Sequence, residues 1–134
     1  MAGYSGTPLA RKLGLKPGFK LKTQNAPPDY ERLLTPIPDG VAIAADFAAE
    51  VDLWHLFTTT RGELESRLPV CLREIVAGGM IWVSWPKKAS GVASEVTEDT
   101  VREVALPLGL VDVKVCAVDE TWSGLKLVVR KERR

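Results

Sequence analysis

Polar side chains that could bind an anion follow two apolar segments of the chain, Val51–Phe57 and Met80–Trp85. Three threonines follow the first segment, and two lysines and a serine follow the second. Together with an asparagine after an earlier segment, the candidate ligand-binding residues are Asn25, Thr58, Thr59, Thr60, Lys87, Lys88 and Ser90. A helix predicted to begin at Arg61 would point free backbone N–H groups to the same place, which favours a phosphate or carboxylate. The alternative interpretation is that the threonines only cap this helix and the lysines are solvated.

A second polar cluster is the predicted turn Asp119-Glu120-Thr121-Trp122-Ser123-Gly124. Asp119 and Trp122 are further candidates for ligand binding, because this turn is expected at the same edge of the sheet. Asp119 and Glu120 could act as an acid and base pair only if one carboxyl were desolvated. In the alternative interpretation the segment is only a hairpin turn, in which Asp119 binds its own backbone and Trp122 folds over the core.

The remaining reactive residue types do not form a catalytic set. His55 is the only histidine and lies among apolar neighbours, so we expect a packed, hydrogen-bonded side chain and not a catalytic base. Without a second histidine, no metal site is predicted. Cys71 and Cys116 are expected to be buried and inert, with no disulfide between them. The residues therefore identify neither a catalytic group nor a cofactor.

The hydrophobic pattern predicts an α/β fold with six strands and helices on both faces of a mostly parallel sheet. The segment Val51–Phe57 is apolar on both faces, as is typical of a central parallel strand. The last two strands are expected to form an antiparallel hairpin. The predicted order across the sheet is Val41–Ala45, Phe19–Gln24, Val51–Phe57, Met80–Trp85, Leu125–Lys131 and Leu110–Val118.

The helix signals are caps and breakers. A short first helix is predicted over Pro8–Leu13. The helix that follows Thr60 is expected to be kinked or split at Pro69 and to end at Gly78-Gly79. Thr97 is predicted to cap the next helix.

Length and composition fit one soluble domain over residues 1–134. The chain has 134 residues, of which 46% are hydrophobic and 26% charged, with a net charge of +1. We divide it into an N-terminal helix and turn at 1–18, the α/β body, and a basic tail at 131–134. The near-neutral charge disfavours nucleic acid as a partner, and no apolar run is long enough for a membrane helix. Lacking a signal-peptide pattern, the chain is expected to be cytoplasmic.

The order of these elements resembles class I S-adenosylmethionine-dependent methyltransferases, whose Rossmann-like sheet ends in an antiparallel hairpin. The resemblance implies a three-layer Rossmann-like α/β fold with a cofactor cleft after the first strand. The chain departs from that family where a glycine-rich loop is usual, because Asn25-Ala26-Pro27-Pro28 stands there. The short connection between Ala45 and Val51 also leaves no room for the family's third strand and helix.

Longer strings of the chain identify it as a member of a bacterial family, domain-of-unknown-function family 3052. The strings are "YSGTPLARKLG", "WPKKASGV", "TEDTVRE" and "GLVDVKVCAVDETWSGLKLV". This resemblance implies a short Rossmann-like fold and brings no activity with it.

Three functions remain open. The leading hypothesis is a non-catalytic Rossmann-like module that binds a small anionic ligand or a protein partner, since the sheet is kept and the glycine-rich loop is lost. The second is an S-adenosylmethionine-dependent methyltransferase with a degenerate cofactor loop. The third is a structural or assembly protein that forms a homo-oligomer through the outer strand Leu110–Val118, in which valines alternate with other side chains.

Overall fold

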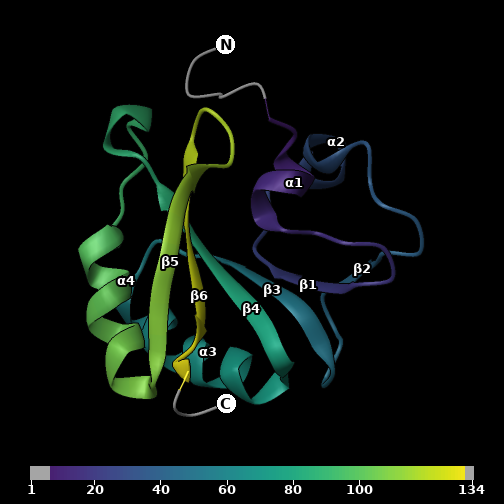
Figure 1. The fold of residues 1–134 in the computed structure, drawn as a ribbon. Coiled ribbons are helices and arrows are strands. Elements are labelled where there is room, and N and C mark those ends of the chain that lie inside the picture. The colour runs from purple at the N-terminus through teal and green to yellow at the C-terminus, as the bar shows by residue number, and fades with distance from the viewer. Residues whose placement is uncertain (1–6, 132–134) are drawn as a thin grey trace.

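The computed structural model of the protein describes residues 7–131 and contains a six-stranded sheet with helices on both faces (Figure 1). The strands are β1 Lys20–Gln24, β2 Ala42–Ala44, β3 Val51–Phe57, β4 Ile75–Pro86, β5 Leu110–Ala117 and β6 Trp122–Val129. The helices are α1 Leu9–Leu13, α2 Tyr30–Leu34, α3 Arg61–Glu74 and α4 Glu98–Ala105, with short 3₁₀ turns at Lys88–Ser90 and Leu106–Leu108.

The strand order is β2-β1-β3-β4-β6-β5, which confirms the predicted order. Strands β2, β1, β3 and β4 are parallel, and β6 runs antiparallel to both of its neighbours. The result is the predicted three-layer Rossmann-like fold, with a mostly parallel sheet that ends in an antiparallel hairpin.

Two hydrophobic cores lie on opposite faces of the sheet. On one face, α3 and α4 bury Leu64, Leu68 and Val101 against the sheet. On the other face, α1 and α2 bury Leu13 and Leu34. Strand β3 contributes to both cores, which explains why its sequence is apolar on both faces. In Figure 1, α1 and α2 lie near β1 and β2 at one edge of the sheet, and the hairpin β5–β6 forms the opposite edge.

The prediction that α3 ends at Gly78-Gly79 is wrong. The helix ends at Glu74, and Ile75 already pairs with Val51 at the start of β4. The register of β3 and β4 shifts between Val51 and Leu53, so the glycines lie in an irregular part of the strand. A Cβ atom on Gly79 would lie 2.9 Å from the carbonyl oxygen of Val76, closer than side chains tolerate. Gly79 is therefore needed for a close backbone approach within the strand, and Gly78 for its positive φ of 79°, as at β-bulges.

Other boundaries also differ from the expectations. Helix α3 runs through Pro69 without being split, and α1 begins at Leu9, one position after the predicted start. Strand β6 begins at Trp122, so the polar turn of the hairpin is shorter than predicted. Of the predicted basic tail at 131–134, only Lys131 lies within the described residues. No helix among residues 7–131 is long and apolar enough to cross a membrane.

Candidate functional site

The candidate site lies where β1 and β3 end, because the chain leaves these neighbouring strands in opposite directions at this switch point. The side-chain amide of Asn25, just after β1, donates to the carbonyl of Phe57 at 3.1 Å and to Oε2 of Glu63 at 3.2 Å. The hydroxyl of Thr58, just after β3, donates to Oε1 of the same carboxylate at 2.6 Å. The Glu63 carboxylate thus bridges the two strand ends, and two of the predicted ligand-binding residues bind the chain itself.

The beginning of α3 also binds a carboxylate of the chain. The backbone N–H of Arg61 donates to Oε1 of Glu95 at 3.0 Å, and the backbone of Glu95 donates to the carbonyl of Thr59 at 2.8 Å. The side chain of Thr60 accepts from the backbone N–H of Glu63 at 3.2 Å and caps the helix. An anion was predicted at this helix start, and Glu95 supplies it from within the chain.

The lysines and serine after β4 do not converge on the switch point. The Lys87 ammonium donates to the carbonyl of Asp119 at 2.8 Å, and the Ser90 hydroxyl donates to the carbonyl of Lys87 at 2.6 Å. Both residues therefore stabilise the loop and the adjacent hairpin turn. Lys88 is exposed and lines a pocket of about 400 Å³ between this loop and the start of α4. The lining residues are Trp85, Pro86, Lys88, Val92, Ser94, Val96, Thr97 and Asp99.

The hairpin turn has the geometry of the alternative interpretation. Oδ1 of Asp119 accepts from the backbone N–H groups of Thr121 at 2.8 Å and Trp122 at 2.7 Å, as in an Asx turn. The Trp122 ring packs edge-on against Phe57, with 5.1 Å between the ring centroids. Neither side chain faces the Lys88 pocket. That these two residues bind a ligand stays a prediction.

His55 is not placed for acid and base chemistry. The ring is fully buried, with Nδ1 2.6 Å from the Tyr30 hydroxyl and Nε2 2.7 Å from the Ser84 hydroxyl. Burial lowers the pKa of His55 to about 3 and raises the pKa of Tyr30. The expectation of a packed, hydrogen-bonded histidine is confirmed.

The cysteines have little thiolate character. Burial raises the pKa of Cys71 to about 12 and raises that of the half-buried Cys116. Both thiols are free, but the expectation that both are buried holds only for Cys71, because Cys116 lies on the edge strand β5 and is partly exposed.

Glu63 and Glu95 also belong to this region, although no sequence pattern pointed to either of them as a site residue. In the sequence, Glu63 stands three residues after Thr60. This is the spacing of a capping box, which indicates only a local contact at the start of a helix. Its contact with Asn25 spans 38 residues of sequence and depends on the pairing of β1 with β3.

A family model described as a protein of unknown function, DUF3052, matches residues 42–131 of the chain. The chain belongs to this family. The match spans β2 to β6, and so includes Glu63, Glu95 and the loop after β4. No curated protein sequence matches the chain.

Solved structures with the same fold include a methyltransferase and proteins in complex with SAH or S-adenosyl-L-methionine. A putative type 11 methyltransferase from Sulfolobus solfataricus is 13% identical, with a TM-score of 0.65 over 92% of this chain and 90% of that one. DhpI in complex with SAH is 11% identical, with a TM-score of 0.60 over 92% and 83%. Aeropyrum pernix fibrillarin with natively bound S-adenosyl-L-methionine is 12% identical, with a TM-score of 0.54 over 94% and 70%. At these identities the similarity establishes the fold.

Proposed function

We propose that the protein is a non-catalytic, methyltransferase-like module that binds a small anionic ligand or a protein partner. The observation that carries this proposal is the Glu63 carboxylate, which bridges Asn25 and Thr58 at the switch point. Ligands of doubly wound sheets bind outside the carboxyl ends of the strands, and here side chains of the chain hold that position.

The segment after β1 supports the same conclusion. A cofactor loop needs glycines so that its backbone can approach the ligand, and Asn25-Ala26-Pro27-Pro28 has none. The two prolines also lack the N–H groups that would bind a carboxylate or phosphate. Among the described residues, the one histidine is sealed in the core, so no imidazole can serve as a base at this edge.

The proposal predicts that S-adenosylmethionine and SAH do not raise the unfolding temperature. A ligand at a hundred times its dissociation constant adds about 2.7 kcal/mol, a shift of roughly ten degrees in a domain of this size. The measurement is the thermal unfolding of the wild-type protein and of the Glu63→Ala variant, each with and without the two compounds. A shift of several degrees in the wild-type protein would overturn the proposal in favour of a methyltransferase with a degenerate loop, which the shared fold supports.

The assembly hypothesis depends on the edge strand β5. Val113 and Val115 are 52% and 46% exposed there, which favours pairing between subunits. Two features oppose it: the register is irregular between Asp112 and Lys114, and Asp112 is held by Arg102 of α4 at 3.0 Å. Bulges and charged side chains at an edge prevent strand addition.

We therefore expect light scattering to give the monomer mass of 14.6 kDa over a wide range of concentrations. The Val115→Lys variant is the control and should give the same mass. A wild-type dimer that Val115→Lys dissociates would instead establish β5 as an interface.

A further inference from the structure

The sheet face that carries α1 also holds an unbalanced group of lysines at the hairpin β5–β6. Lys114 of β5 and Lys126 of β6 are directly opposite each other, and opposite residues of an antiparallel pair share a face. Trp122 lies an even number of residues from Lys126 and packs with the core under α1 and α2, which places both lysines on that face. We call Lys16, Lys114 and Lys126 the lysine cluster.

Lys16 joins the strand lysines through the end of α1. A Cβ atom on Gly14, which ends α1, would lie 3.8 Å from the Lys126 ammonium and 3.5 Å from the Met80 side chain. Lys16 follows two residues later and is exposed. Burial, then the charges of Lys114 and Lys16, lower the pKa of Lys126, so both neighbouring charges act on the Lys126 ammonium.

No carboxylate of the described chain neutralises the lysine cluster. Within residues 7–131, the ion pairs of lysines and arginines involve Lys20, Lys22, Arg32, Arg61 and Arg102. Like charges directly opposite each other in a sheet are destabilising. The half-buried Lys126 therefore carries a cost that a bound anion would remove.

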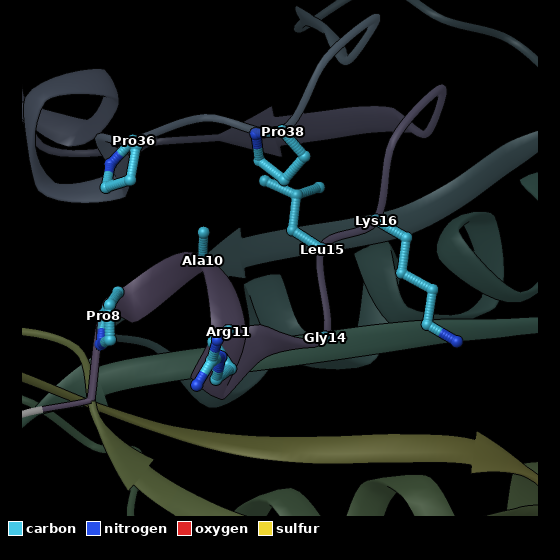
Figure 2. A pocket seen from close by; sticks show the side chains of 8 residues that line it. All are labelled: Pro8, Ala10, Arg11, Gly14, Leu15, Lys16, Pro36 and Pro38. Carbon is cyan, nitrogen blue, oxygen red and sulfur yellow. The ribbon is translucent and has the colours of Figure 1, made fainter.

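An apolar pocket adjoins the lysine cluster. It has a volume of about 370 Å³ and is lined by Pro8, Ala10, Arg11, Gly14, Leu15, Lys16, Pro36 and Pro38. Figure 2 shows Pro36 and Pro38 on the side of Leu15, with the Lys16 side chain leading away from both prolines. The pocket and the cluster share a border, because Gly14 and Lys16 line the pocket, Gly14 adjoins the Lys126 ammonium and Lys16 belongs to the cluster.

We propose that the lysine cluster binds the phosphate of a small organic phosphate whose apolar part lies in the proline-lined pocket. A phosphate carries up to two negative charges and several acceptor oxygens, whereas a carboxylate would leave most of the positive charge unbalanced. Lysine ammonium groups bind phosphate as point charges. The inference rests on the proposed binding function and gives that function a ligand class and a place away from the switch point.

The test is a titration with phenyl phosphate, inorganic phosphate and phenol, followed by calorimetry and thermal unfolding. We expect phenyl phosphate to bind more tightly than inorganic phosphate, and phenol to bind least. Lys126→Gln and Lys16→Gln should each weaken phenyl phosphate about tenfold, the loss expected for one charge-assisted hydrogen bond. Arg73→Gln removes an exposed positive charge of α3, on the opposite face of the sheet, and is the control with unchanged affinity.

Without ligand, Lys126→Gln should raise the unfolding temperature, because it removes like-charge repulsion. Binding that survives in both Lys126→Gln and Lys16→Gln would overturn the inference, as would no binding of any phosphate. Tighter, strongly salt-dependent binding of a DNA oligonucleotide would also overturn it and assign the surface to a nucleic-acid backbone. Binding of S-adenosylmethionine that Lys126→Gln leaves intact would instead count against the proposed function and not against this site.

Discussion

Lowering the pH from about 7 to about 5 is expected to reduce the free energy of unfolding by about 2 kcal/mol, because His55 must stay uncharged in the folded protein. Its pKa falls to about 3 through burial, whereas an unfolded histidine titrates near 6.5. The unfolded chain therefore takes up a proton first. The stabilising contribution is complete above the unfolded pKa and is lost progressively as the pH falls toward the folded one.

The surroundings of His55 explain why the ring resists protonation. A neutral imidazole has one donor and one acceptor nitrogen, which match the hydroxyls of Tyr30 and Ser84. The ring also stacks on Phe57, with 4.2 Å between centroids, so a charged ring would lie against an aromatic core. Burying a charge without a charged partner is costly.

Urea unfolding at both pH values measures the effect, and His55→Gln is the control. The variant should be less stable than the wild-type protein at both pH values. Its free energy of unfolding, however, should change much less between the two pH values than that of the wild-type protein. Because the chain has one histidine, its NMR resonance can be followed without ambiguity and should not titrate between about pH 5 and 8. Equal wild-type stability at the two pH values would contradict a sealed histidine.

Lys22→Met is expected to lower the free energy of unfolding by about 3–5 kcal/mol, since it strands a buried carboxylate. The Lys22 ammonium lies 2.7 Å from Oε1 of Glu74, and their side chains are only 8% and 15% exposed. The indole N–H of Trp54 donates to the same oxygen at 2.7 Å, and Lys22 also donates to the carbonyl of Phe47 at 2.5 Å. This network joins β1, β3 and the end of α3.

The pH dependence of this pair has a defined sign. Desolvation alone would raise the pKa of Glu74, but the hydrogen bonds from Lys22 and Trp54 outweigh it and hold the pKa below its usual range. In the wild-type protein the contribution is present above the unfolded pKa and is lost as the pH falls through the folded one. In Lys22→Met the Glu74 carboxylate has lost its partner, and protonation in acid removes its charge. The loss of unfolding free energy relative to the wild-type protein should therefore become smaller as the pH falls.

Two controls separate burial from charge pairing as such. Arg32→Met removes a similar pair with Asp29, but Arg32 is 81% exposed there, and the expected loss is under about 1 kcal/mol. The double variant Lys22→Met with Glu74→Gln keeps an acceptor for Trp54 and should recover part of the loss. Equal losses in Lys22→Met and Arg32→Met would contradict a buried ion pair in solution.

Some features of the fold follow from short-range pattern. The apolar run Val51–Phe57 indicated a central parallel strand, and Thr97 indicated the start of α4, where its hydroxyl accepts from the backbone N–H of Thr100 at 3.3 Å. The same logic failed at Gly78-Gly79, which reads equally well as a helix stop and as an irregular strand. Only the pairing of Ile75 with Val51 distinguishes the two.

The sequence by itself determined the order of elements, the family and the absence of a glycine-rich loop, because these are properties of neighbouring residues or of whole strings. The tertiary structure decided what fills the place of that loop and where unbalanced charge accumulates. Glu63 reaches Asn25 only because β1 and β3 are adjacent, and Lys114 faces Lys126 only through the register of the hairpin. Such contacts depend on strand pairing between distant residues, and local periodicity carries no information about which distant side chains will meet.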